Sequence, residues 1–148
     1  MGIITQRVEL AREGNLPELV CRMPSGWAVM GDVQVVPGYC LLLPDPVVTT
    51  LNDLAFTERA CYLNDMATLG DAVLKVTGAV RINYAMLGNL EPELHAHVFP
   101  RYADEPAELR TKPVWLYNWD HAQRFHPDKH GDLQSRIREE LSAGADPV

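Results

Sequence analysis

Two histidines and a glutamate alternate with apolar residues in the segment Glu93-Leu94-His95-Ala96-His97. In a β-strand, alternate residues share one face and lie roughly 6–7 Å apart along it, so the three polar side chains would form a row. An imidazole with one nitrogen held by a hydrogen bond and the other free can act as a nucleophile or a base near neutral pH. A second imidazole beside it can carry charge or a proton. His95 and His97 are therefore candidate catalytic residues.

The same row has two other interpretations. An antiparallel sheet often exposes one face to water, and a solvated face would also carry polar side chains. Glu93, His95 and His97 also have the ligand types of a metal site with two histidines and one carboxylate. Ligands on one straight strand lie too far apart for all three to reach an ion at about 2.1 Å without distortion. A metal-dependent enzyme is therefore the less favoured alternative.

The turn before this segment, Gly88 to Pro92, offers backbone N–H groups and the side chain of Asn89 close to His95. Such a concave set of donors can hold a phosphate oxygen. An ordinary hairpin loop would also be built from Gly and Asn. Asn83 belongs to the preceding predicted strand and would point to the side of His95 if the two strands pair.

Alternation of apolar and polar residues predicts the strands that position this site. Two strands, 26–30 and 39–43, are joined by a turn-rich segment, and two more are expected at 80–86 and 93–99. In the last of these, Leu94, Ala96 and Val98 should face the core. Paired strands of this kind would bring the candidate residues to one face of a sheet.

Two helices are predicted. The longer helix covers 57–76, with Thr57 as its N-cap and Gly78 as its stop. A C-terminal helix begins at Asp132 and buries Leu133, Ile137 and Leu141. Two hairpin-like strand pairs separated by a helix favour an α+β fold, in which an antiparallel sheet packs against the long helix.

Length and composition are those of one folded domain. The chain has 148 residues, of which 47% are hydrophobic and 22% charged. We expect a single domain over 1–148, with a core at about 20–102 and a C-terminal extension with a short helix at 103–148. The extension holds Trp115, Tyr117 and Trp119, which either pack under a loop or form a stacking wall or dimer surface. Its three histidines, His121, His126 and His130, are expected at the surface, and Arg101 either braces a carboxylate or reaches a ligand.

Charge and cysteine content exclude several classes of function. The 13 Lys and Arg residues against 20 Asp and Glu residues give a net charge of −7, which argues against a non-specific nucleic-acid binder but permits a small anionic ligand. Three widely spaced cysteines suggest neither a disulfide framework nor a zinc knuckle, so a reducing compartment is expected. No segment resembles a signal peptide or a membrane span. The sequence therefore predicts a cytoplasmic protein without a membrane partner.

Two segments resemble the histidine triad superfamily. RINYAMLGNLEPELHAHVFPRY at 81–102 is similar to the family's signature, in which three histidines alternate with apolar residues before Pro-Arg. VVPGYCLLLPDPVVTTLNDL at 35–54 is similar to the family's Pro-Gly turn, hydrophobic strand and short helix. The similarity covers about residues 25–102, and the chain resembles a bacterial-type histidine triad protein similar to diadenosine polyphosphate hydrolases.

The resemblance implies a homodimeric nucleotide hydrolase or nucleotidyl transferase that forms a covalent nucleotidyl-histidine. Dinucleoside polyphosphates or nucleoside phosphoramidates would be its substrates. By position, His95 would be the nucleophile and His97 would contact the phosphate. Gly88 and Asn89 match the phosphate loop, and Asn83 matches an asparagine of the site. No cofactor is required, although a divalent cation could enter with a polyphosphate substrate.

The sequence departs from the family pattern at two positions that would contact substrate. Glu93 stands in place of the first histidine of the triad, and Tyr39 stands in place of the histidine that often follows the Pro-Gly turn. A carboxylate beside a phosphate repels it unless the carboxylate is protonated or paired. The departures therefore leave an alternative open, a nucleotide-binding or interaction module with little or no turnover.

Overall fold

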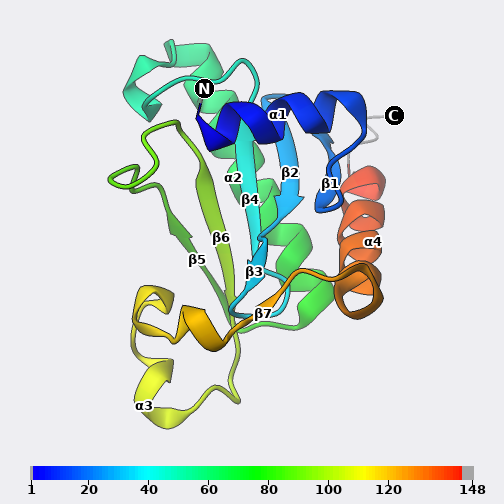
Figure 1. Ribbon diagram of the computed structural model, residues 1–148, viewed down its shortest axis with the longest axis vertical. Helices are drawn as coiled ribbons and strands as arrows, with labels where there is room; N and C mark the ends of the chain where they lie inside the picture. Colours follow the sequence, from blue (N-terminus) through cyan, green and yellow to red (C-terminus); the bar gives the residue numbers. More distant parts are fainter. Residues whose placement is uncertain (1, 145–148) are drawn as a thin grey trace.

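A five-stranded antiparallel sheet forms the centre of the computed structural model, which describes residues 2–144 (Figure 1). Its strand order is β1-β2-β4-β6-β5, and a separate short pair joins β3 to β7. The strands are β1 (Leu19–Met23), β2 (Gly26–Met30), β3 (Val33–Gln34), β4 (Cys40–Pro44), β5 (Arg81–Ala85), β6 (Ala96–Arg101) and β7 (Gln123–Arg124). The predicted pairs β2–β4 and β5–β6 both form, and β4 joins them by pairing with β6. The expected α+β class is confirmed.

Helices cover both faces of the sheet. The helices are α1 (Ile3–Glu13), α2 (Phe56–Thr77), α3 (Ala107–Arg110) and α4 (Pro127–Gly144), with 3₁₀ turns η1 (Leu51–Asp53), η2 (Val114–Leu116) and η3 (Trp119–His121). In Figure 1, α1 crosses in front of β4 and β2, whereas α2 lies behind the sheet. No helix within residues 2–144 is long and apolar enough to cross a membrane.

The alternation along β6 separates two apolar clusters. Leu94, Ala96 and Val98 pack with α2 and α4, as the sequence predicts. Phe99 points to the opposite face and packs with α1. Because successive side chains of a strand point to opposite faces, His97 lies on the α1 face.

The predicted strand 93–99 begins later than expected, at Ala96, and extends to Arg101. The backbone N–H of Leu94 donates to the carbonyl of Val48, which lies outside the sheet. The carbonyl of Glu93 accepts a hydrogen bond from the ring of His95. These hydrogen bonds take residues 93–95 out of the sheet ladder.

The helix boundaries differ from prediction at their starts. Ala55 is the N-cap residue of α2, and Thr57 lies inside its first turn. The expected stop is confirmed, since Gly78 ends α2 with a left-handed φ of 70°. α4 begins at Pro127, a residue favoured at the first helical position. Asp132 is therefore not a cap but lies within α4.

Helix α1 and strand β1 were not predicted from the sequence. Ile4, Val8 and Ala11 form the buried stripe of α1. Near the C-terminal end of α1, Arg12 forms an ion pair with Asp45. Asp45 also accepts a 3.0 Å hydrogen bond from Nε1 of Trp27. The hydrogen bond from Arg12 lowers the pKa of Asp45 to about 2. These contacts fix α1 across the face that carries His97.

Candidate active site

His95 and His97 lie side by side where β6 begins. Their ring centroids are 4.8 Å apart and the ring planes are inclined by 71°. His95 precedes the first residue of the strand and is 9% exposed, while His97 is within it and partly buried. The sequence correctly predicts that both imidazoles share a face opposite the Leu94, Ala96 and Val98 core.

The hydrogen bond of His95 fixes its tautomer. Nδ1 of His95 lies 2.7 Å from the carbonyl oxygen of Glu93. A carbonyl oxygen only accepts hydrogen bonds, so Nδ1 must carry the proton. In the neutral ring, Nε2 therefore carries the lone pair and is available as a nucleophile or a base.

His97 is held by aromatic and polar contacts. The hydroxyl of Tyr39 lies 2.6 Å from its Nδ1. The ring is parallel to Phe99 at a centroid distance of 5.6 Å and perpendicular to Trp115 at 4.9 Å. Burial, with a smaller contribution from the charge of His95, lowers the pKa of His97 to about 3. His97 is therefore neutral at physiological pH.

Tyr39 is fixed between the sheet and a glycine. Its ring stacks on Phe99 at a centroid distance of 4.3 Å. A Cβ on Gly31 would lie 2.2 Å from Cδ2 of this ring, so Gly31 leaves the space that Tyr39 occupies. Burial raises the pKa of Tyr39, which keeps its hydroxyl protonated.

The carboxylate of Glu93 is bound to α1 and not to the two imidazoles. Its Oε1 accepts a 3.0 Å hydrogen bond from the backbone N–H of Thr5, and its Oε2 accepts one from the Thr5 hydroxyl. The hydroxyl bond is the largest cause of a lowered pKa of Glu93. A Cβ on Gly2 would lie 2.0 Å from Oε1, so the glycine permits this close approach. The first turn of α1 thus holds the negative charge of Glu93.

This arrangement does not favour the metal interpretation of the row. The Glu93 carboxylate is hydrogen-bonded to Thr5, so it is not free to complete a set of three ligands with His95 and His97. Within residues 2–144, no three His, Cys, Asp or Glu side chains are grouped so that they could hold a metal ion.

A cavity of about 480 Å³ opens beside His95. Residues around η1 form one wall of the cavity, and the turn between β5 and β6 forms the other. The lining residues are Thr49, Thr50, Leu51, Asn52, Met86, Leu87, Gly88, Asn89, Pro92, Leu94 and His95. Gly88 has a φ of 67°, in the left-handed region that favours glycine. The structure therefore brings Gly88, Asn89 and His95 to one cavity, as the sequence predicts.

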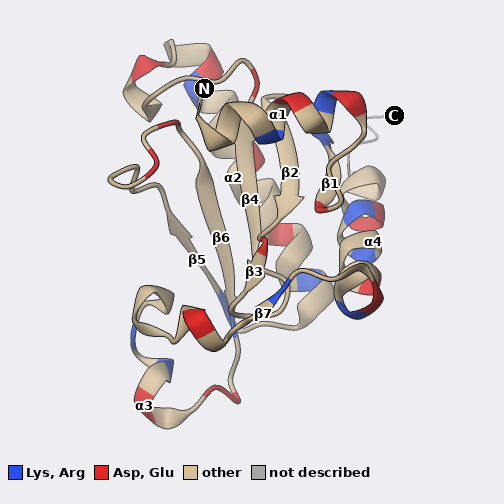
Figure 2. Cartoon of the chain, viewed as in Figure 1, with Lys and Arg blue, Asp and Glu red and all other residues tan. Residues whose placement is uncertain are grey.

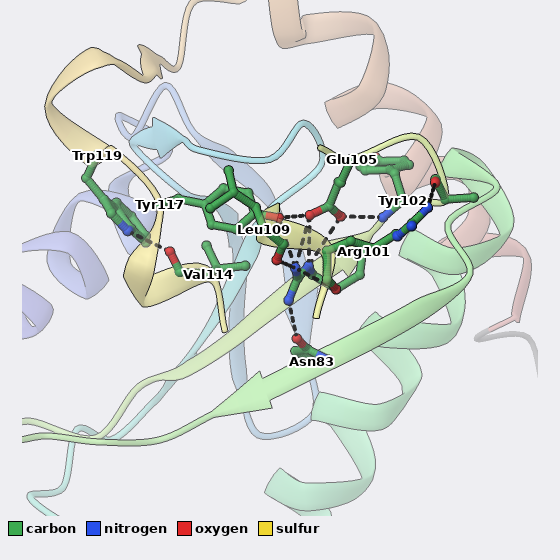
Figure 3. A network of polar contacts seen from close by, with 10 residues as sticks. Asn83, Arg101, Tyr102, Glu105, Leu109, Val114, Tyr117 and Trp119 are labelled. Atoms are coloured by element: carbon green, nitrogen blue, oxygen red, sulfur yellow. Dashed lines mark hydrogen bonds and ion pairs between the residues drawn. The ribbon is translucent and has the colours of Figure 1, made fainter. Parts of the chain in front are cut away.

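Asn83 lies on the face of His97 but belongs to a different polar network (Figure 3). It pairs with Phe99 across the strands, and its Oδ1 accepts a 2.9 Å hydrogen bond from Arg101. Arg101 is 7% exposed and pairs with Glu105 at 3.0 Å, so it braces a carboxylate. Tyr117 also accepts a 2.9 Å hydrogen bond from Arg101. This network ties the C-terminal segment to β5 and β6.

The C-terminal extension forms an aromatic wall beside His97. Trp115 and Trp119 are stacked at a centroid distance of 5.4 Å, and Nε1 of Trp119 donates to the carbonyl of Val114. Trp115 is 39% exposed. Of the three histidines in this extension, His121 and His126 are exposed as predicted, but His130 is buried against Phe125.

Sequence reasoning missed the contribution of α1 to this site. Thr5 binds Glu93, and two guanidinium nitrogens of Arg7 are buried on the same helix. The spacing of Ile4, Val8 and Ala11 was the signal that could have identified a packed helix there.

Structural comparison finds close similarity to histidine triad proteins. A histidine triad protein from Bradyrhizobium japonicum is 22% identical, with a TM-score of 0.73 over 84% of this chain and 91% of that chain. A histidine triad protein from Marinobacter aquaeolei is 18% identical, with a TM-score of 0.75 over 97% of this chain and 98% of that chain. A zinc-bound histidine triad family protein from Mycobacterium smegmatis is 16% identical, with a TM-score of 0.66 over 95% of this chain and 99% of that chain.

The comparisons by sequence give no match, either to a protein-family model or to a curated protein. The structural similarities show that this chain has the fold of the histidine triad proteins.

Proposed function

We propose that the protein is a nucleotide hydrolase or nucleotidyl transferase that uses His95 as its nucleophile. The observation that carries the proposal is the hydrogen bond from Nδ1 of His95 to the carbonyl of Glu93, because it leaves the lone pair on Nε2 of a histidine that lines the cavity. The resemblance of segments 35–54 and 81–102 to the histidine triad pattern, together with the fold shared with histidine triad proteins, supports the same reaction class. Dinucleoside polyphosphates and nucleoside phosphoramidates are the proposed substrates.

The reaction has two displacements at the α-phosphorus. Nε2 of His95 attacks phosphorus and forms an N–P bond, while the P–O or P–N bond to the leaving group breaks and its electron pair leaves with that group. The leaving group takes up a proton from solvent. Water then attacks phosphorus and releases a proton to solvent, while the N–P bond breaks and its electron pair returns to Nε2, so the nucleoside monophosphate leaves and neutral His95 is restored. Transfer to another acceptor follows the same course with that acceptor in place of water.

His97 is the proposed donor to a non-bridging phosphate oxygen. With the Tyr39 hydroxyl donating to Nδ1, the neutral imidazole carries its proton on Nε2. Backbone N–H groups around Gly88 and the side chain of Asn89 would contribute further donors at the cavity. Preorganised donors of this kind stabilise charge that develops on phosphate oxygens in the transition state.

The position of Glu93 favours turnover over simple binding. Its charge is held by Thr5 at the first turn of α1, so it does not face the phosphate as the sequence pattern suggests. The proposed reaction needs no cofactor. A divalent cation would enter only with a polyphosphate, whose oxygens it would bridge.

A homodimer in the cytoplasm is the proposed state of the protein. β5 is an edge strand of the sheet, whereas the other edge strand, β1, has carbonyls bound by Gln134 and Arg138 of α4. An open strand edge can pair with a second copy. Light scattering coupled to size-exclusion chromatography tests this state, and a monomer at all concentrations would contradict it.

Product analysis tests the function. The chelator-treated protein is incubated with diadenosine polyphosphates and with adenosine phosphoramidate, beside His95→Ala. We expect wild-type protein alone to release AMP. Binding of AMP without release of product, with and without restored divalent ions, would favour the nucleotide-binding module instead.

A further inference from the structure

A second cavity, of about 510 Å³, lies at the opposite end of β5 from the cavity that contains His95. Its walls come from the start of β5, the end of β6 and residues 110–113. Arg81 pairs with Arg101 there, whereas Ala85 pairs with His97 four residues further along β5. At about 3.3 Å per residue, these pairs lie about 13 Å apart along the strands. The two cavities are therefore separate.

The side chains of this second cavity carry one sign of charge, and we call it the basic cavity. Four basic residues line it, namely Arg81, Arg101, Arg110 and Lys112. Figure 2 shows blue segments where β5 begins and β6 ends, and near α3. Among the lining residues in the described part of the chain there is no Asp or Glu, although the chain contains 20. A cavity lined by one sign of charge attracts ions of the opposite sign.

Most of this positive charge has no partner in the fold. Glu105 lies 3.0 Å from Arg101 and balances its charge. The other three basic residues, Arg81, Arg110 and Lys112, are exposed and form no ion pair within residues 2–144. Because like charges around one cavity repel each other, a bound anion would remove an unfavourable interaction.

Hydrogen bonds of the buried Arg101 hold the cavity together (Figure 3). Its Nη2 donates to the carbonyls of Leu109 and Arg110, at 3.3 and 3.5 Å, and so attaches the end of α3 to β6. Nη1 of Arg110 in turn donates to the carbonyl of Ala103, a lining residue, at 3.3 Å. Nη1 of Arg101 carries two N–H groups, and its bond to Asn83 uses one of them. Strand and helix are thus fixed on two sides of the cavity.

The composition and size of the basic cavity indicate the chemistry of its ligand. Guanidinium and ammonium groups form strong charge-assisted hydrogen bonds with phosphate oxygens. A phosphate monoester carries a charge of about −1.5 to −2 near neutral pH, so three unpaired cations suit more than one phosphate. Cavities that bind small molecules have volumes of about 300–1,000 Å³, which include that of the basic cavity. A diphosphate group fits both the charge and the volume.

We propose that the basic cavity binds the diphosphate group of a small molecule, at a site separate from His95. Arg81, Arg110 and Lys112 donate to its oxygens from β5 and from the end of α3. The ligand is either free pyrophosphate or a nucleoside diphosphate, which share this group. The site does not depend on the proposed reaction. A second copy paired with β5 would use the backbone of that strand, whereas Arg81 projects from its face.

The test compares two double variants of the full-length protein. Arg110→Met/Lys112→Met removes two cations from the basic cavity. Arg124→Met/Lys129→Met is the matched control, because Arg124 and Lys129 are also exposed, form no ion pair within residues 2–144 and do not line the basic cavity. Calorimetric titration at constant ionic strength, with a chelator present, measures the affinity for pyrophosphate, ADP and sulfate.

We expect pyrophosphate to bind the wild-type protein at one site per chain and more tightly than sulfate. Arg110→Met/Lys112→Met should bind pyrophosphate about 10-fold more weakly or worse, and the control should stay within about 2-fold of wild type. Arg81→Met removes a cation from the β5 side and should also weaken binding. ADP that binds more tightly than pyrophosphate would identify a nucleoside diphosphate as the ligand, and weaker binding of ADP would identify free pyrophosphate.

Equal affinity of wild type and Arg110→Met/Lys112→Met for pyrophosphate would overturn the proposal. A similar loss in the control would also overturn it, because net charge and not the cavity would then attract the anion. If the double variant fails to fold, unchanged binding by Arg81→Met is the contradicting result. Absence of pyrophosphate binding to wild type would refute this site alone, since release of AMP by His95 is measured separately.

Discussion

The hydroxyl of Tyr39, the residue before β4, lies 2.6 Å from Nδ1 of His97 in β6. In the sequence, Tyr39 departs from the histidine triad pattern. In the structure, its hydroxyl forms a hydrogen bond with Nδ1 of His97. This contact fixes the orientation of His97 without adding a charge to the site.

Loss of this contact should weaken both stability and turnover. Tyr39→Phe leaves Nδ1 of a half-buried imidazole without its partner, so we expect the free energy of unfolding to fall by about 1–3 kcal/mol. Denaturant unfolding and the rate of AMP release measure the two effects. Tyr84→Phe is the control, since Tyr84 is 41% exposed and its change should stay within about 0.5 kcal/mol. Equal stability of both variants would contradict this role of Tyr39.

Gly31 should not tolerate a side chain, because the ring of Tyr39 occupies the space next to it. In Gly31→Ala the new Cβ meets the Tyr39 ring at 2.2 Å, so the ring must shift and the free energy of unfolding should fall by about 1–3 kcal/mol. Gly131→Ala is the matched control, because nothing lies within 4 Å of its added Cβ inside α4. The control should be stabilised by about 0.5–1 kcal/mol. A Gly31→Ala protein as stable as wild type would show that Tyr39 is not confined.

The attachment of α1 should weaken in acid. The folded-state pKa of Asp45 is about 2, and that of Glu93 is also lowered. Carboxylates with lowered pKa values stabilise the fold fully above their unfolded pKa of about 4, and this contribution is lost as pH falls toward the folded value. Stability should therefore decline from about pH 5 to pH 2. Asp45→Asn should flatten that decline in denaturant titrations, whereas an unchanged slope would contradict the assignment.

A carboxylate should be tolerated at Leu90, in the turn before the histidine segment, but not at Leu94 within it. Leu94 is 5% exposed, and Leu94→Asp would bury an unpaired carboxylate in the α2 and α4 core, at a cost of about 3 kcal/mol or more. Leu90 is 99% exposed, so Leu90→Asp should change stability by no more than about 0.5 kcal/mol. Chemical unfolding of both variants tests the assignment. Similar losses in the two would contradict the buried position of Leu94.

The sequence predicts the sheet and the faces of β6 because alternation has a simple physical meaning. Burial of one face of this segment places three alternate apolar residues in the core, Leu94, Ala96 and Val98. The residues between them, His95 and His97, must then lie on the opposite face. The start of β6 was not predictable in the same way. A ring-to-carbonyl hydrogen bond within residues 93–95 replaces the ladder there, and periodicity does not reveal such a bond.

The role of α1 depends on contacts between distant parts of the chain. Thr5 and Glu93 are 88 residues apart in sequence, and neither residue type alone indicates the other as its partner. The sequence pattern therefore predicts Glu93 beside the substrate, whereas in the structure its carboxylate accepts hydrogen bonds from Thr5 of α1. Asn83 is a similar case, since pairing of β5 with β6 puts it on the expected face but Arg101 binds its amide oxygen.

Detection of the covalent intermediate tests most directly whether His95 is the nucleophile. Wild-type protein and His95→Ala are mixed with diadenosine polyphosphate, quenched in alkali to preserve the acid-labile N–P bond, and analysed by mass spectrometry. We predict an AMP adduct on wild type that maps to His95 and is absent from the folded His95→Ala protein. Release of AMP by His95→Ala at the wild-type rate, or an adduct at another residue, would show that His95 is not the nucleophile.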